Sequence, residues 1–272
     1  MKQNKKQTFA LYFGNRGFFP ASLIASARDE VAAAVEKAGF DYLMPPSDMT
    51  RYGAVETKDE GLKYAEWLGE HIGEYDGLIM SLPNFSDENG AVAAVRDCGV
   101  PIFIQAYPDE IGKMDFDHRR DSYCGKFSIC DVFHQYKIPF TIMPPHVVHP
   151  NTDAFAKNLS DFAAVCRVVN GMKRFTIGVI GARTTKFKTV RYDEITLQKY
   201  GITCDTYDLS ELFYRVEKMD GNSAAVKVKI EKLIGYTDFS SVPKDKTETL
   251  AKVSVAIDDM MREYHLDCIT LR

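Results

Sequence analysis

The stretch FTIGVIGARTTKFKTVRYDEITLQKYGITCDTYDLSEL, residues 175–212, decides the fold prediction. It predicts an apolar strand, a loop rich in Arg, Lys and Thr, a helix, a second strand and a further helix that starts at an Asp. Open α/β sheets bind ligands where a strand leads into such a loop, because strand ends and helix N-termini meet there. The composition of the loop favours an anionic or hydroxyl-rich small molecule over a hydrophobic one; its polar residues are Arg183, Thr184, Thr185, Lys186, Lys188 and Arg191.

Upstream of this stretch, apolar strands alternate with amphipathic helices. Strands are predicted at residues 8–13, 41–44, 76–81, 101–105 and 140–143. Helices are predicted at residues 22–38, 57–74, 90–97, 123–136 and 153–170. Alternation at this spacing indicates parallel strands joined by crossover helices. The predicted fold class is therefore α/β, with two Rossmann-like doubly wound parallel-sheet domains at residues 1–171 and 172–272.

The second domain is predicted to be incomplete. After residue 212, two helices are predicted near residues 223–233 and 246–264, and residues 266–272 have the pattern of a buried strand. No loop or helix follows that strand. We therefore expect this chain to be the front part of a longer protein.

Composition narrows the class of protein. The 272 residues carry a formal net charge of −4 and no basic tract, which argues against nucleic-acid binding. No apolar run has the length that crosses a bilayer, and none follows the basic N-terminus as it would in a signal peptide. The six cysteines form no CxxC pair, so we expect mostly buried, reduced thiols and a cytoplasmic location.

Two loops of the first half carry candidate ligand contacts. The sequence GNRGFFP after the first strand lacks the spacing of a dinucleotide fingerprint, and Arg16 within it is interpreted either as a ligand contact or as a solvated loop residue. Asn84, Phe85 and Glu88 follow the third predicted strand and share the edge of Arg16. An aromatic face beside amide and carboxylate groups is a common way to hold a sugar ring. The alternative is a helix N-cap built from Ser86 or Asp87.

Other polar segments carry weaker signals. Asp121 or Ser122 is expected to cap the helix that follows, and the alternative is that neighbouring basic residues contact a ligand at a subunit boundary, namely His118, Arg119, Arg120 and Lys126. His146 and His149 are flanked by prolines that prevent a helix, so exposed loop histidines are favoured over a metal pair. No catalytic or metal-binding constellation has a diagnostic spacing.

At this point the residues resemble a known family. The run IGVIGARTTKFKTVRYDEITLQKYGI, followed by DTYDLSE, is similar to the second domain of the L-fucose/L-arabinose isomerase superfamily. The runs SLPNFSDENGAVAAV, VPIFIQAYPDE and RRDSYCGKFSICDVFHQYKIPFT resemble the first domain of the same fucose-isomerase-like proteins. The resemblance covers essentially the whole chain.

The resemblance implies a metal-dependent aldose–ketose isomerase, with Mn²⁺ as the usual metal and a trimeric or hexameric assembly. It also implies that Arg16 and Phe85, with Asn84 beside Phe85, serve the active site of a neighbouring subunit. The loop Arg183–Phe187 is implied to border the substrate. In the family the metal ligands come later in the chain, so this sequence is expected to lack a complete metal site and to be inactive alone.

The function predicted from the sequence is the N-terminal portion of such an isomerase, which supplies substrate-binding loops and oligomer contacts. The substrate-binding residues are predicted to be Arg16, Asn84, Phe85, Glu88, Arg183, Thr184, Lys186 and Phe187. The expected partners are a sugar or sugar acid and further copies of the chain. The alternatives are a non-catalytic carbohydrate-binding or regulatory protein and a nucleotide-binding oxidoreductase on the same fold.

Overall fold

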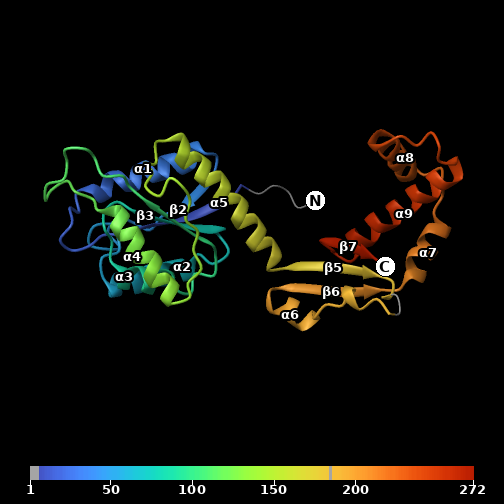
Figure 1. The fold of residues 1–272 in the computed structure, drawn as a ribbon, viewed down its shortest axis with the longest axis horizontal. Helices are drawn as coiled ribbons and strands as arrows, with labels where there is room; N and C mark the ends of the chain where they lie inside the picture. Colours follow the sequence, from blue (N-terminus) through green and yellow to red (C-terminus); the bar gives the residue numbers. More distant parts are fainter. Residues whose placement is uncertain (1–5, 184–185) are drawn as a thin grey trace. The chain divides into compact units, whose positions relative to one another are not determined.

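The computed structural model describes residues 6–183 and 186–272. Thr184 and Thr185, both part of the predicted binding loop, lie outside the described residues. The chain divides into two compact units, residues 1–170 and 171–272 (Figure 1). Each unit contains a sheet of parallel strands with helices in the connections, one sheet of four strands and one of three, which confirms the predicted α/β class.

The first unit alternates strands and helices up to a long final helix. Its elements are β1 (Thr8–Phe13), α1 (Leu23–Lys37), β2 (Asp41–Leu43), α2 (Lys58–Glu70), β3 (Gly77–Leu82), α3 (Glu88–Val95), β4 (Ile102–Ala106), α4 (Ser122–Gln135) and α5 (Asp153–Met172). The strand order is β2-β1-β3-β4, and every pair is parallel. The loops after β1, β3 and β4 therefore emerge at one edge of the sheet.

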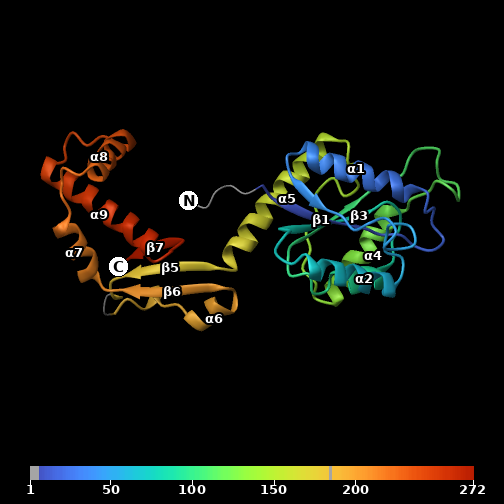
Figure 2. The same ribbon diagram turned by 180° about the vertical axis from the view of Figure 1, so that it is seen from behind.

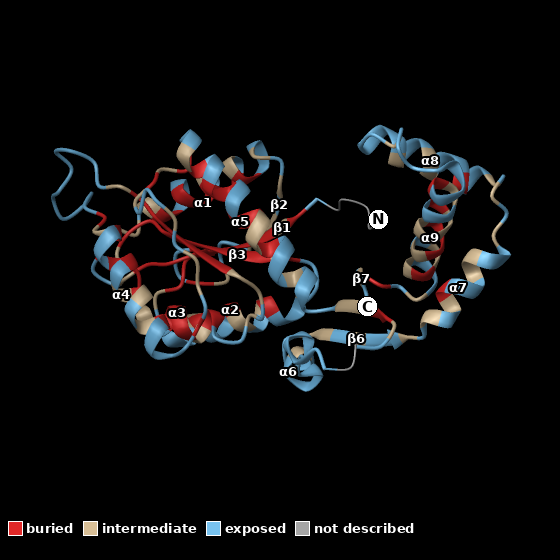
Figure 3. Ribbon diagram, turned by 45° about the vertical axis from the view of Figure 1, so that its right-hand side comes forward, coloured by how far each residue is buried: buried red, intermediate tan, exposed pale blue. Residues whose placement is uncertain are grey.

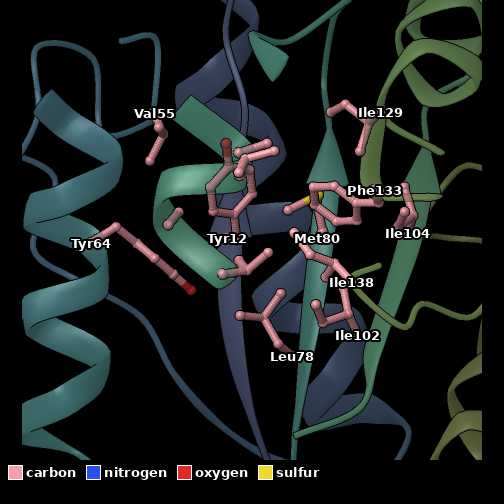
Figure 4. Close-up of a cluster of buried hydrophobic side chains, with 14 of the residues drawn as sticks. Tyr12, Val55, Tyr64, Leu78, Met80, Ile102, Ile104, Ile129, Phe133 and Ile138 are labelled. Atoms are coloured by element: carbon pink, nitrogen blue, oxygen red, sulfur yellow. The ribbon is translucent and has the colours of Figure 1, made fainter. Parts of the chain in front are cut away.

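Side chains of β1 alternate between the two faces of this sheet. Ala10 and Tyr12 pack in a core cluster with residues of α2, α3 and α4, whereas Phe9 and Leu11 pack in a second cluster with residues of α1 and α5. Figures 1 and 2 show the corresponding layers, with α1 and α5 on one face of the sheet and α2, α3 and α4 on the other. Figure 4 shows the first cluster, where Tyr12 lies among side chains of α2, β3, β4 and α4. Burial on both faces explains why the central strands read as continuous apolar runs.

Residues 140–143, predicted as a strand, form only an isolated bridge. Thr141 pairs with Phe103 of β4 and exchanges backbone hydrogen bonds with Ile102 and Ile104. Pro139 before this segment and Pro144 after it have no N–H to donate, so the ladder stops after one pair. The predicted strand is thus wrong in extent, since only Thr141 pairs with the sheet.

The start of α4 also differs from its prediction. Asp121, at the N-cap position, has a positive φ of 48° and makes no capping hydrogen bond with its side chain, and Oγ of Ser122 has no hydrogen-bond partner among the described residues. The cap expected from these two residues is therefore absent. Instead, a carboxylate from the preceding loop, Asp109, accepts hydrogen bonds from the backbone N–H groups of Arg120 and Asp121 at 2.9 and 3.1 Å.

Among its described residues, the second unit combines a three-stranded sheet with four α-helices. Its elements are β5 (Phe175–Ile180), a 3₁₀ turn at Lys188–Val190, α6 (Glu194–Lys199), β6 (Ile202–Tyr207), α7 (Leu209–Lys218), α8 (Ala224–Tyr236), α9 (Lys244–Glu263) and β7 (Cys268–Leu271). The order β6-β5-β7 is parallel throughout. Helix α9 packs against α7 in one small core and against α8 in another. Figure 3 shows how few residues of this unit are buried compared with the first.

Two predictions about burial were wrong. Strand β7 exists, but its residues are half-buried or exposed rather than buried. Of the six cysteines, all free, only Cys166 is buried; Cys124 is exposed and the others lie between. Within the described residues, no helix is long and apolar enough to cross a membrane.

Candidate sugar site

Three loops at the carboxyl edge of the first sheet are tied together by buried amides. Nδ2 of Asn84 donates to Oδ1 of Asn15 at 2.6 Å, and Nδ2 of Asn15 donates to Glu56 at 3.0 Å. Both asparagines are almost completely buried. The loop after β1 also passes so close to the loop after β3 that a Cβ on Gly14 would lie 1.8 Å from Oγ of Ser86. Gly14 is thus required by internal packing, and Asn84 fixes the loops rather than facing solvent.

The guanidinium of Arg16 is held by the carboxylate of Glu88. Nη1 of Arg16 donates to both oxygens of Glu88, at 3.0 and 2.9 Å, from the loop after β1 to the first turn of α3. Oγ of Ser128, on α4, donates to the same carboxylate at 2.5 Å. The side chains of Arg16 and Glu88 are 32% and 20% exposed, so the pair lies at the surface but not free in solvent.

The pKa of Glu88 reflects this arrangement. Burial by itself raises the pKa of this carboxyl. The hydrogen bonds from Ser128, from the backbone and from Arg16, together with the charge of Arg16, outweigh burial and leave the pKa below its ordinary value. Glu88 is therefore ionised at neutral pH and compensates the charge of Arg16.

Aromatic rings surround the same guanidinium. The Arg16 guanidinium carbon lies 4.8 Å from the ring centroid of Phe85, and Phe85 stacks on Phe19 with centroids 5.6 Å apart. The guanidinium of Arg119 lies 5.1 Å from the centroid of Phe19. The guanidinium of Arg16, the rings of Phe85 and Phe19, and the guanidinium of Arg119 thus form one column at the edge of the sheet.

Basic residues of the segment before α4 have mainly structural partners. Arg120 is buried and donates to the backbone oxygen of Pro83 at 2.9 Å. Lys126 is also buried, and its Nζ donates to the backbone oxygen of His146 at 2.9 Å. Burial lowers the pKa of Lys126 to about 8. These two residues brace the loops around the site, whereas His118 is exposed and paired with Asp115.

A second candidate site lies within the second unit, at the carboxyl edge of its sheet. Gly181 follows β5 with a φ of +87°, a conformation that favours glycine. A cavity of about 430 Å³ opens beside it, lined by Arg183, Phe187, Val190, Thr270, Leu271 and Arg272. Lys186 is exposed and is not part of the lining. Arg183 and Phe187 thus line one cavity.

The structure brings together three of the predicted residues of the first unit, namely Arg16, Phe85 and Glu88. Sequence reasoning missed Ser128, the second hydrogen-bond donor to Glu88. A lone serine in a helix has no distinguishing pattern, and only the packing of α4 on the loop after β3 reveals it. That packing depends on Gly125, where a Cβ would lie 1.8 Å from the backbone oxygen of Phe85.

Metal-binding side chains are not grouped into a site in the described part of the chain. Within residues 6–183 and 186–272, no group of three or more His, Cys, Asp or Glu side chains could hold a metal ion. His149, predicted as an exposed loop histidine, is instead half-buried: it lies 3.4 Å from Glu30 and packs edge-on against Tyr107. The described residues therefore do not fit the Mn²⁺ that the resemblance implies.

A known protein family matches most of the first unit. The family model described as fucose/sulfoquinovose isomerase, N-terminal domain, matches residues 10–173. The match covers more than half of the chain and contains the whole Arg16–Glu88 site. This chain belongs to that family. The comparison with curated proteins gave no match.

Proposed function

We propose that this chain forms the sugar-binding N-terminal part of an aldose–ketose isomerase. The observation that carries the proposal is the convergence of Arg16, Glu88 and Phe85 at the carboxyl edge of a parallel sheet, within the matched residues. Guanidinium and carboxylate groups bond hydroxyls, and an aromatic ring packs on the C–H face of a sugar. The site thus offers contacts for a sugar, and within the described residues it offers no metal ligands.

In this proposal the chain's own residues bind and orient the substrate. Isomerisation moves a proton between C1 and C2 of an open-chain sugar and needs an acid/base group close to the reacting carbons. Arg16 would fix the position of the sugar through its hydroxyls, and Glu88 would keep the guanidinium in place. The proposal includes assembly as a homo-oligomer, a cytoplasmic location and dependence of catalysis on Mn²⁺, each as an expectation from the resemblance.

Calorimetric titration with L-fucose and sulfoquinovose, the two sugars in the family description, tests the binding part. We expect saturable binding of at least one of them to the chain and loss of that binding in Arg16→Ala. Arg96→Ala is the matched control, because Arg96 is an exposed arginine at the other end of α3. Equal binding by both variants, or no binding by the unmodified chain, would contradict the proposal.

A second assay tests whether this chain catalyses isomerisation by itself. The chain is incubated with each sugar and Mn²⁺ in deuterated water, and exchange at C2 is followed by NMR. Exchange would show catalysis by this chain. Binding without exchange would mean that this chain supplies binding loops but not catalysis. That result is expected both for the N-terminal part of an isomerase and for our alternative, a non-catalytic carbohydrate-binding protein.

A further inference from the structure

The aromatic ring best placed to meet a sugar at this site is the one that sequence reasoning passed over. Phe85 is flanked by the guanidinium of Arg16 and by the ring of Phe19, at centroid distances of 4.8 and 5.6 Å. Phe19 is only 7% exposed. Phe18, the next ring in the loop after β1, is 61% exposed.

Phe18 is exposed without being loose. Its centroid lies 4.9 Å from that of Phe19, so the column described above supports it from behind. The loop is closed by a turn in which the backbone N–H of Phe19 donates to the backbone oxygen of Arg16 at 2.8 Å. A Cβ on Gly17, inside that turn, would lie 2.9 Å from Oε1 of Glu56, so the turn is packed against a neighbouring loop. A ring held this way loses little entropy when a ligand covers it.

Hydrogen-bond donors lie next to this ring. The guanidinium carbon of Arg16 is 6.0 Å from the centroid of Phe18. Of the Arg16 nitrogens, only Nη1 donates to Glu88, and among the described residues no side chain or backbone group accepts a hydrogen bond from Nε or Nη2. These donors are therefore left for a ligand that lies on Phe18.

The two arginines of this column are paired with carboxylates. Arg16 is paired with Glu88 at 2.9 Å, and Arg119, whose guanidinium lies 5.1 Å from the centroid of Phe19, is paired with Asp121 at 2.7 Å. An apolar ring beside a neutralised arginine that keeps further N–H donors suits the uncharged face of a sugar, with C–H groups on the ring and hydroxyls toward Arg16.

We propose that Phe18 is the aromatic platform of the sugar site, where it packs against an uncharged C–H face of the sugar while Arg16 donates to adjacent hydroxyls. The proposal rests on the proposed function, since it names the contact residue of that site. It differs from the expectation drawn from the resemblance, which gave the aromatic contact to Phe85.

Calorimetric titration of the full chain with L-fucose and L-fucitol tests this role. We expect Phe18→Ala to weaken binding about tenfold and Phe18→Trp to retain it, because a larger ring keeps the platform. Phe213→Ala is the matched control, since Phe213 on α7 is 59% exposed. Trp67 is the only tryptophan in the chain, so Phe18→Trp also adds a second fluorophore whose emission should change when sugar is added.

The outcomes separate this inference from the proposed function. Suppose that the unmodified chain binds sugar, that Arg16→Ala abolishes this binding and that Phe18→Ala leaves it unchanged. The proposed role of Phe18 is then refuted, while the proposed sugar site is supported. If no variant binds, including the unmodified chain, both fail. If Phe18→Ala lowers the oligomeric mass in light scattering and leaves sugar affinity unchanged, Phe18 is an interface residue and the inference is overturned.

Discussion

At the scale of single residues, the site depends on one ion pair whose strength follows pH. Glu88 has a pKa below its ordinary value of 4.5, so its contribution to stability is fully present above that value. As the pH falls through the lowered pKa, the folded state takes up the proton and the contribution is lost. We expect Glu88→Gln to lower the free energy of unfolding by about 1 kcal/mol at neutral pH.

Urea unfolding of the unmodified chain and of Glu88→Gln, from neutral pH to below the ordinary carboxyl pKa, checks this expectation. The difference between the two proteins should shrink as the pH falls. Glu66→Gln is the control, because Glu66 is an exposed carboxylate on α2 and its change should show no such dependence. A difference that stays constant with pH would mean that Glu88 stabilises by packing alone.

The buried lysine of α4 gives a pH dependence of opposite sign. Because burial lowers the pKa of Lys126 from 10.5 to about 8, the charged form costs the folded state about 3 kcal/mol. This cost is complete below the lowered pKa and disappears as the pH rises toward the ordinary value, where the unfolded state alone holds the proton. We expect Lys126→Met to stabilise the chain at neutral pH by about 2 kcal/mol, since the hydrogen bond to His146 is also lost.

The measurement is the free energy of unfolding of both proteins at neutral pH and near pH 9.5. The difference in free energy of unfolding between Lys126→Met and the unmodified chain should become smaller at the higher pH. The buried tyrosines are present in both proteins and do not change this difference. Lys63→Met, which changes an exposed lysine of α2, should give no such narrowing. If the difference in stability does not change with pH, burial of the Lys126 charge is not its cause.

At the scale of elements, the approach of α4 to the loop after β3 holds the site together. A Cβ at position 125 would lie 1.8 Å from the backbone oxygen of Phe85, so Gly125→Ala must push α4 away. We expect a loss of about 2 kcal/mol in unfolding free energy. We also expect weaker sugar binding, because Ser128 on α4 would separate from Glu88.

Gly69→Ala is the matched control for this substitution. Gly69 lies in α2, and a Cβ there would have no neighbour within 4 Å. Alanine has the higher helix propensity, so this variant should gain about 0.5 kcal/mol. Thermal unfolding measures the stability of both variants, and titration measures their sugar binding. Equal stability of Gly125→Ala and Gly69→Ala would show that α4 can shift without loss of unfolding free energy.

At the scale of the whole molecule, the two units differ in how well they are packed. The strands β1, β3 and β4 are almost wholly buried, whereas β6 and β7 contain several exposed residues. Because buried apolar area provides most of the stabilisation, the second unit should unfold at lower denaturant.

The single tryptophan makes the two units distinguishable. Trp67 lies in α2 of the first unit, so its fluorescence reports that unit, while far-ultraviolet circular dichroism reports both. With increasing urea we expect part of the dichroism to be lost before the fluorescence changes. Coincident curves from the two probes would indicate one cooperative transition instead.

The proposed assembly is tested at the same scale. Several large apolar side chains of the segment before α4 and of α4 itself are exposed: Ile111, Met114, Phe116, Tyr123 and Phe127. Exposed apolar side chains in one part of the chain support the proposal of contacts between copies. Light scattering should then give a mass that is a multiple of 30.7 kDa, and Phe127→Ser should reduce it. A mass of 30.7 kDa at micromolar concentration would contradict a stable oligomer.

Local chemistry explains which elements were predictable. Thr57 and Asp208 accept hydrogen bonds from the backbone N–H groups of Glu60 and Ser210, so α2 and α7 start where the capping residues indicated. Helix α1 ends just before Gly39, whose φ of +87° is the left-handed conformation that a glycine after a helix C-terminus commonly adopts. The short extent of pairing at residues 140–143 follows from the flanking Pro139 and Pro144, which the predicted strand did not take into account. The start of α4 depends on the carboxylate of Asp109, which lies earlier in the same loop and has no fixed spacing from a helix start.

Hydrophobic periodicity and helix capping act over a few residues. The class of fold, the order of strands and helices along the chain, and the loops that bear Arg16, Phe85 and Glu88 could therefore be predicted from the amino-acid sequence. Four features of the site emerged only from the folded chain: Glu88 neutralises Arg16, Ser128 supports Glu88, Asn84 is buried, and Phe18 rather than Phe85 is exposed. The physical reason is that side-chain exposure and pairing depend on contacts between segments far apart in the chain. Those distances, such as the 72 residues between Arg16 and Glu88, leave no local pattern.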